Sequence, residues 1–458
     1  MARFALSLRY EAIPKPVTEI AKRFLLDSLG CALAAVRLKD IQAAYNFVEQ
    51  LGGKKQASII WYGDKTNLSN AALMNSLLIR ANDYNDVYWR QDPSHPSDII
   101  PAALTPAEFR GATGKELLTA IVIAYELEMR LCRAAEPGVR EVGWHHATLT
   151  QFVSPLVAGR ILGLSEDQMV SAVGIAGSSH FTLGGVVAGH LTNMKNAADP
   201  LAVEAGVRAA MLARAGYSGP PEVFEGKEGL FEVLSNVKWN RDVLADGLGE
   251  EFLTTTCGLK AFPTEALTHQ PITATLELMQ ESKIDSREII EVLVETTKRG
   301  ADILSDASKY HPATKETADH SLPYCIAVAI AKGNVLPSAF EEKALQDESV
   351  LELLPRIKVV ANPQIDAIFP SVKRAIVTIT TKDGRAASKQ EDSAKGEPER
   401  PLSDDELIAK FHNNAKFALT KRRREELIKA TLALDQYANV GKYVPLLVRG
   451  GTTQRARR

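Results

Sequence analysis

The hydrophobic spacing of this chain changes once, near Phe262 and Pro263, and that change limits the folds that the chain can adopt. Before this point apolar residues recur at every third or fourth position, which is the spacing of amphipathic helices. After it, alternating apolar and polar residues predict strands at 289–296, 356–361 and 375–380, with helices expected at 321–331 and 341–354. A chain of 458 residues is also too long for one ordinary core. The sequence therefore predicts a mainly α fold, in which a large all-helical domain is joined to a smaller α+β domain.

Helical patterns return near the C-terminus. The polar, charged run 386–401 predicts a loop or linker, and Ser403 with Glu406 then forms the capping-box pattern that begins a helix. The same pattern occurs earlier at 113–116 and 165–168. Because the late helices resemble those of the first half, we expect a discontinuous helical domain with the α+β unit inserted as a lid. The expected ranges are 1–265 for the first helical segment, 266–400 for the α+β lid, and 401–458 for the returning helical segment and tail.

Composition excludes several classes of protein. The formal net charge of -2 gives no reason to expect a nucleic-acid partner or an anionic membrane surface. No run of about 18 apolar residues is present to span a membrane, and no signal-peptide pattern opens the chain, so a cytoplasmic protein is expected. The four cysteines lie far apart and are expected to be reduced and buried. No C-x-x-C spacing occurs, which disfavours zinc ribbons and iron–sulfur clusters held by that motif.

The stretch from Asp83 to Asp98 lies between two apolar helical segments and has an unusual composition. It contains four aspartates, two tyrosines, a tryptophan and a histidine. Buried charge is costly unless it is paired or put to use, whereas a solvated loop does not need three large aromatic residues. The combination favours an active-site wall in which Asp83 or Asp86, with His95, transfers protons. A solvated interhelical loop with aspartate caps is the alternative that these residues leave open.

Two lysines and two adjacent histidines extend this candidate site. Lys195 lies at the start of an alanine-rich helix, and Lys260 lies in a loop stiffened by proline, so both could direct an ammonium group toward an anionic ligand. Solvated lysines with packed stems are the alternative. His145 and His146 are expected to point to different faces, so the two should not bind one metal ion. Together with Asp83 and His95, these residues would form a pocket for a polycarboxylate.

Seven short motifs follow one another along the chain. They are Asp83-Tyr84-Asn85-Asp86, His95-Pro96-Ser97-Asp98, Gly143-Trp144-His145-His146, Met194-Lys195, 224–229, Lys260-Ala261-Phe262-Pro263 and 316–324. In this order, over residues from about 15 to 440, they resemble the MmgE/PrpD family. The resemblance implies a helical domain, an α+β lid that moves over it, an active site between the two, and a homodimer. It also implies an enzyme that uses no metal and no other cofactor.

Within that family, the spacing between Asp83 and His95 and the motif that begins at His95 resemble those of the 2-methylcitrate dehydratase branch. The implied function is that of a lyase, a dehydratase that removes water from a tricarboxylic hydroxy acid. With 2-methylcitrate or citrate as the substrate, the product would be 2-methyl-cis-aconitate or cis-aconitate. Decarboxylation of cis-aconitate, epimerisation of iminodisuccinate, and a binding or scaffold protein without catalytic activity are the alternatives.

The resemblance implies catalytic roles for Asp83, His95, His146, Lys195 and Lys260. The two lysines would stabilise charge that builds on a substrate carboxylate. Asp83 and His146 are the candidate bases, and His95 is the candidate acid that protonates the departing hydroxyl group.

Asp86, His145 and Tyr324 are expected to bind substrate. Two residues depart from the family pattern. Val87 replaces a threonine that is usual after the Asp-x-Asx-Asp run, and His145 replaces an aspartate that is common before the histidine. Whether His145 or His146 fills the family's histidine role is therefore left open, with His146 favoured.

Overall fold

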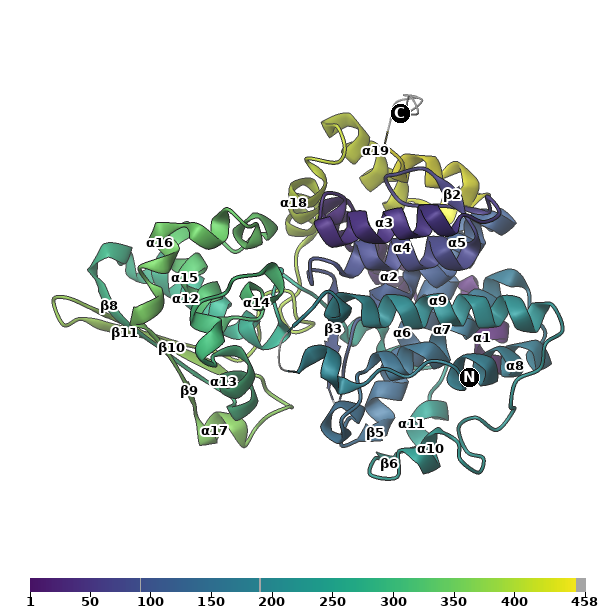
Figure 1. The fold of residues 1–458 in the computed structure, drawn as a ribbon, viewed down its shortest axis with the longest axis horizontal. Helices are drawn as coiled ribbons and strands as arrows, with labels where there is room; N and C mark the ends of the chain where they lie inside the picture. The colour runs from purple at the N-terminus through teal and green to yellow at the C-terminus, as the bar shows by residue number, and fades with distance from the viewer. Residues whose placement is uncertain (91, 189–190, 450–458) are drawn as a thin grey trace.

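A computed structural model describes residues 1–90, 92–188 and 191–449 of the chain. Figure 1 shows a large helical domain beside a smaller domain in which helices pack against a sheet. The predicted fold class, mainly α with an α+β second domain, is confirmed. The three expected domain ranges stay predictions, and residues 450–458 at their end lie outside the described part.

The helical domain is built from long helices that pack in pairs. Those of its first segment are α1 (Ala2–Ser7), α2 (Lys15–Ala35), α3 (Lys39–Leu51), α4 (Leu68–Arg80), α5 (Ile100–Arg110), α6 (Gly114–Ala134), α7 (Ala147–Leu162), α8 (Glu166–Gly177) and α9 (Met194–Arg214). The predicted capping boxes begin α6 at Thr113 and α8 at Ser165. Helix α9 packs against α4, α7 and α8, so it lies at the centre of this domain.

The returning segment completes the same core. Helices α18 (Asp404–Ala415) and α19 (Lys421–Leu432) pack against α2, and the third predicted capping box begins α18 at Ser403. In α2, a Cβ atom added at Gly30 would lie 3.1 Å from Cδ2 of Phe411 in α18. A small residue is therefore needed where the two helices approach. The prediction of a discontinuous helical domain is confirmed.

The second domain contains one sheet of four strands in the order β11-β10-β8-β9. These strands are β8 (Ile289–Thr296), β9 (Ile357–Ala361), β10 (Ala375–Thr381) and β11 (Ala386–Glu391). Strand β8 pairs antiparallel with β10 and parallel with β9. Helices α12 (His269–Ser282) and α15 (Leu322–Lys332) pack against each other beside the sheet. The three predicted strands are confirmed.

The structure corrects two details of the sequence analysis. Strand β11 occupies the start of the run 386–401, which was expected to be a loop. It is an edge strand whose residues are exposed or half-buried, so it carries no apolar alternation. The helix expected at 341–354 is broken into short helical turns.

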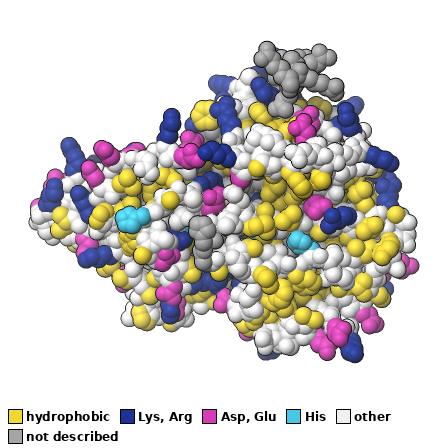
Figure 2. All heavy atoms as spheres, viewed as in Figure 1, with side chains coloured by type: hydrophobic (Ala, Val, Ile, Leu, Met, Phe, Trp, Pro, Cys, Tyr) yellow, Lys and Arg dark blue, Asp and Glu magenta, His cyan; other side chains and the backbone are white. Residues whose placement is uncertain are grey.

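Two separate apolar cores underlie the two domains. The larger core joins α1 to α9 with the returning helices, and the smaller one joins α12 and α15 to the sheet. Figure 2 shows the corresponding two lobes on one face of the molecule, with apolar side chains most extensive over the helical lobe. All four cysteines are buried and unbridged. Within residues 1–90, 92–188 and 191–449, no helix is long and apolar enough to cross a bilayer.

Candidate active site

A cavity of about 860 Å³ lies between the two domains. Six of the eight predicted site residues line it, and they are Asp83, His95, His145, His146, Lys195 and Lys260. Of the stretch from Asp83 to Asp98, the described residues are buried or half-buried except Arg90. The alternative of a solvated interhelical loop is therefore wrong.

Backbone pairing brings the distant parts of this site together. Asp83 follows the end of α4 with a φ of +48°, a left-handed conformation that few non-glycine residues adopt. The chain then forms β3 (Asp86–Trp89), which pairs with β7 (Gly258–Leu259). That pairing places Lys260 beside Asp83, although 177 residues separate them in sequence. Lys195 enters from the first turn of α9.

Asp83 is surrounded by three cationic side chains. Its Oδ2 atom lies 3.0 Å from Lys195 Nζ, and its Oδ1 atom lies 2.8 Å from Lys260 Nζ. Arg80, one helical turn earlier, also pairs with Oδ1. Burial alone would raise the pKa of Asp83, but the charges of Arg80, Lys195 and Lys260 hold it well below its usual range. Asp83 is thus a firmly ionised carboxylate and a weak base.

The balance of charge at this point is positive. Asp98 and Asp199 are further carboxylates near Arg80, and Asp98 Oδ2 lies 3.4 Å from Arg80 Nε. Burial raises the pKa of Asp98 well above its usual range, so this side chain favours the neutral form. Arg80, Lys195 and Lys260 therefore face two ionised carboxylates, Asp83 and Asp199, which leaves a net positive charge that attracts a further anion.

His95 lies next to these cations. Its Nδ1–H group donates a hydrogen bond to the main-chain carbonyl of Asp86 at 2.6 Å, which leaves the lone pair on Nε2. Burial lowers the pKa of His95 well below its usual range, and the charges of Arg80 and Lys260 lower it further. His95 is therefore a neutral imidazole that can accept a proton.

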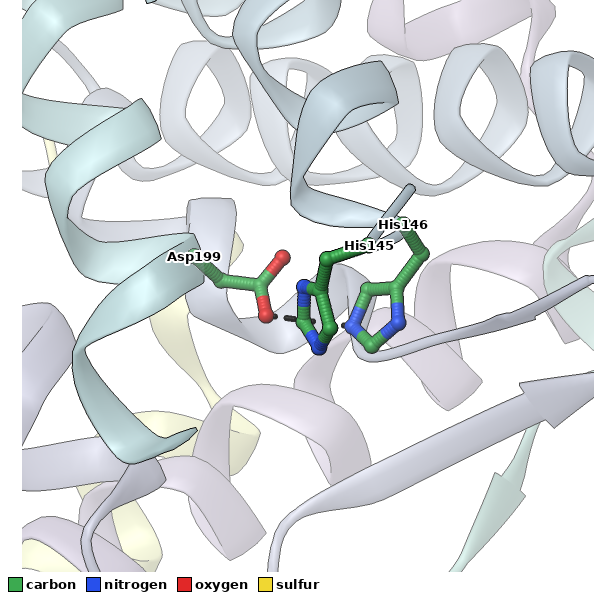
Figure 3. A group of neighbouring side chains, drawn as sticks. All are labelled: His145, His146 and Asp199. Carbon is green, nitrogen blue, oxygen red and sulfur yellow. Dashed lines mark hydrogen bonds and ion pairs between the residues drawn. The ribbon is translucent and has the colours of Figure 1, made fainter. Parts of the chain in front are cut away.

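His145 and His146 lie side by side (Figure 3). Their ring centroids are 3.9 Å apart, so the expectation that the two side chains point to different faces is wrong. The rings converge because both residues precede α7 in a turn, where successive side chains do not alternate as they do in a strand. His146 Nε2 lies 3.1 Å from Oδ2 of Asp199, a buried residue of α9. The ring of His95 lies 5.6 Å from that of His146, so three imidazoles share this side of the cavity.

Potential metal ligands are present, but their hydrogen bonds do not favour an ion. One potential ligand atom from each of His145, His146 and Asp199 lies within 4.8 Å of the other two. The main-chain N–H of Ala147 donates to His145 Nδ1 at 3.2 Å, so the neutral ring carries its proton on Nε2. A metal ion binds a nitrogen lone pair, but in His145 the Nδ1 lone pair accepts the hydrogen bond from Ala147 and Nε2 carries the proton. An ion would also displace the hydrogen bond between His146 and Asp199. The geometry fits a hydrogen-bonded pair better than a metal centre, and the metal-free reaction stays a prediction.

The lid supplies basic residues that sequence analysis did not single out. Arg299 and Lys309 line the cavity, as does Arg140 from the helical domain. Burial lowers the pKa of Arg140, and the nearby charge of Arg299 lowers it further. Within the described part of the chain, no hydrogen bond or ion pair holds the Arg140 guanidinium group. Arg140 is thus available to a carboxylate in the cavity.

Two of the predicted substrate-binding side chains are not brought to the cavity lining. The Asp86 carboxylate is buried and accepts a hydrogen bond from Ser97 Oγ at 2.6 Å. Burial raises the pKa of Asp86 to about 6. Tyr324 lies in the core of the lid and donates its hydroxyl hydrogen to the carbonyl of Ala339 at 2.8 Å. Substrate binding by these two residues stays a prediction without geometric support.

Arg80 and Asp199 belong to this site but were missed in the sequence. Arg80 lies three residues before Asp83, and Asp199 lies four residues after Lys195. Spacings of three and four place side chains on one face of a helix. Asp199 could therefore have been found from Lys195 by spacing alone. The residues of other elements that Asp199 contacts could not have been found from the sequence.

Comparisons with known proteins agree with this architecture. Residues 1–242 match the MmgE/PrpD N-terminal domain, and residues 262–436 match the MmgE/PrpD C-terminal domain. The cis-aconitate decarboxylase-like protein oryM of Aspergillus oryzae is 26% identical over 98% of this chain and 96% of its own length. The 2-methylcitrate dehydratase of Cupriavidus necator is 24% identical, with 93% and 91% covered. The human cis-aconitate decarboxylase is also 24% identical, with 94% and 90% covered. On the strength of both domain matches, the chain belongs to the MmgE/PrpD family.

Proposed function

We propose that this protein is a dehydratase that eliminates water from a tricarboxylic hydroxy acid without a metal. 2-Methylcitrate and citrate are the proposed substrates, and 2-methyl-cis-aconitate and cis-aconitate are the corresponding products. The observation that carries the proposal is a positively charged cluster beside two imidazoles that each leave one ring nitrogen free. An anion would be held by the cluster while the imidazoles transfer protons.

The first step is removal of a proton from carbon next to a carboxylate. Negative charge then builds on that carboxylate, where Lys195, Lys260 and Arg80 would stabilise it. His95 is the proposed base, because its Nε2 lone pair is free, and because burial and the charges of Arg80 and Lys260 keep the ring neutral. Asp83 is not proposed as the base, because both of its carboxylate oxygens are paired with Arg80, Lys195 and Lys260.

The second step is departure of the hydroxyl group. As the carbon–carbon double bond forms, the carbon–oxygen bond breaks and the oxygen takes a proton to leave as water. His146 is the proposed acid, because its Nε2 atom pairs with the Asp199 carboxylate while its Nδ1 atom has no partner among the described residues. This order of base and acid is the reverse of the one expected from the sequence, where His95 was the acid.

Decarboxylation of cis-aconitate is the second candidate. Two relatives aligned over nearly the whole chain carry the names cis-aconitate decarboxylase and cis-aconitate decarboxylase-like protein. Elimination of water needs both a base and an acid, whereas protonation of carbon with loss of carbon dioxide needs one proton donor. The two free ring nitrogens therefore favour the dehydratase. The homodimer and the cytoplasmic location stay predictions.

The test is a spectroscopic assay of chelator-treated protein with 2-methylcitrate or citrate. We expect absorbance of the conjugated enoate to rise, and to stay flat with His95→Gln and with Lys260→Ala. Asp405→Asn, at an exposed position of α18, is the control and should behave as the unsubstituted protein does. A flat trace with the unsubstituted protein, together with release of carbon dioxide from cis-aconitate, would replace the dehydratase by the decarboxylase. A requirement for added metal would overturn the metal-free mechanism.

A further inference from the structure

A chain of hydrogen bonds leads from the interior of the helical domain to His146. Asp199 uses both carboxylate oxygens: Oδ2 lies 3.1 Å from His146 Nε2, and Oδ1 lies 3.0 Å from the hydroxyl oxygen of Thr150. Figure 3 shows Asp199 approaching the two histidines from a neighbouring helix. Both Asp199 and Thr150 are buried, so water does not compete for these bonds.

Glu128 of α6 sets the direction of the hydrogens in this chain. Its Oε1 atom lies 2.9 Å from the Thr150 hydroxyl oxygen and accepts a hydrogen bond from Ser94 at 2.7 Å. Its Oε2 atom is buried and has no hydrogen-bond partner among the described residues. Burial raises the pKa of Glu128 to about 8, so the group is protonated at neutral pH. Glu128 then donates to Thr150, and the single hydroxyl hydrogen of Thr150 goes to Asp199.

His146 differs from the other two imidazoles in its partner. His95 faces cations, and His145 accepts a main-chain hydrogen bond, whereas His146 faces a carboxylate. His146 Nδ1 is buried and has no partner among the described residues. His146 also lines the cavity, and its buried Nδ1 atom lacks the hydrogen bond that a ligand there would supply. Four charged or titratable groups surround the His146 ring, and they are Asp199 from α9, His145 from the same turn, and His95 and Asp92 from the stretch 83–98. Arg80 from α4 acts on this ring indirectly, because its charge acts on Asp199.

We propose that Asp199 is a positioning residue whose carboxylate pairs with His146 Nε2, supplies negative charge to that ring, and aims its Nδ1 atom at the leaving hydroxyl. Glu128 and Thr150 orient the Asp199 carboxylate from behind. The role of the leaving hydroxyl rests on the proposed dehydratase function, whereas the effect of Asp199 on His146 does not. A carboxylate that orients an imidazole through its other ring nitrogen is an arrangement known from hydrolases with a serine, histidine and aspartate.

The kinetic test compares Asp199→Asn with Thr150→Val. Without the carboxylate charge, protonated His146 is disfavoured, so Asp199→Asn should lower kcat roughly 100-fold near pH 8 while KM changes less than about threefold. Activity of this variant should recover partly at lower pH, because the basic limb of its plot of kcat against pH moves to lower pH. Thr150→Val removes a hydrogen bond that disperses the Asp199 charge, so its basic limb should move to higher pH. Glu204→Gln on the same helix, outside the cavity lining, is the control.

A second measurement does not depend on turnover. Protein labelled with ¹⁵N in its nine histidines is titrated by NMR, and the signal of His146 is identified by its loss in His146→Gln. We expect doubly protonated His146 to persist to higher pH in the unsubstituted protein than in Asp199→Asn. Equal titration of His146 in the two proteins would overturn the proposal. It would also be overturned if the basic limbs of the pH profiles of Asp199→Asn and Thr150→Val moved in the same direction. Altered titration in a protein that dehydrates no tricarboxylate would retain the pairing and overturn the dehydratase instead.

Discussion

Two buried aspartates beside one cavity have opposite surroundings. Asp83 pairs with an arginine and two lysines, whereas Asp199 pairs with an imidazole and accepts a hydroxyl hydrogen. Neighbouring positive charge lowers the pKa of both carboxyls in spite of their burial. Arginine and lysine keep their charge over the whole working range of pH, and imidazole does not. The partner, rather than the aspartate, thus decides whether a buried carboxylate builds a fixed field or supports proton transfer.

The backbone around the two aspartates differs as well. Asp199 lies within regular helix α9, while Asp83 lies in a left-handed turn that the returning segment supports. Lys410 of α18 donates hydrogen bonds of 2.8 Å to the carbonyls of both Tyr84 and Lys260. The charge cluster around Asp83 therefore depends on contacts between distant parts of the chain, and the proposed proton-transfer pair of His146 and Asp199 depends mainly on two adjacent helices.

Asp83→Asn should produce the largest effect. It leaves Arg80, Lys195 and Lys260 buried without their shared carboxylate, which should cost about 3–5 kcal/mol of unfolding free energy. Activity should fall at every pH, because the variant loses the carboxylate that holds these three side chains in place. Urea unfolding and kcat measured from pH 6 to 9 check this. If Asp83→Asn loses activity only at high pH, as expected for Asp199→Asn, the contrast between the two aspartates does not hold.

Glu128→Gln should produce an intermediate effect that depends on pH. The folded protein keeps the Glu128 proton up to about pH 8, whereas the unfolded chain releases it near its ordinary pKa of 4.5. Stability of the unsubstituted protein is therefore lost as pH rises through that interval, by up to about 1.4 kcal/mol per pKa unit. Glutamine does not titrate, so the variant should gain stability relative to the unsubstituted protein between pH 5 and pH 9.

Urea unfolding at these two pH values measures the difference. Glu225→Gln, at an exposed position, serves as the control and should leave the pH dependence unchanged. Parallel stability curves for Glu128→Gln and the unsubstituted protein would mean that Glu128 is ionised in the fold. The direction of the hydrogen bonds behind Asp199 would then be reversed.

Tyr324→Phe should produce the smallest effect. Its hydroxyl bonds to the carbonyl of Ala339 inside the lid, so the variant should lose about 1 kcal/mol of stability. Because this side chain does not line the cavity, kcat/KM should change less than about twofold. A rise in KM at unchanged stability would instead support the substrate-binding role expected from the sequence, and would show that the lid rearranges when it binds a ligand.

Sequence reasoning succeeded where the signal is local. The strand 289–296 has the predicted bounds, and the capping boxes depend on residues three positions apart. It failed where partners are distant or where local polarity misleads. The polar edge strand β11 has no apolar alternation to detect. Six of eight site residues meet in the cavity, but the surroundings that separate the roles of Asp83 and Asp199 come from packing of α4, α6, α7 and α9.

The two separate apolar cores have an evolutionary consequence. Every group proposed for proton transfer lies in the helical domain, whereas Arg299 and Lys309 belong to the lid. Mutations in the smaller core or on the lid surface can thus accumulate without moving the imidazoles. A lineage could in this way vary which acid the enzyme selects while inheriting its acid–base groups unchanged. That separation gives a physical route by which relatives named for dehydration and for decarboxylation share one chain plan.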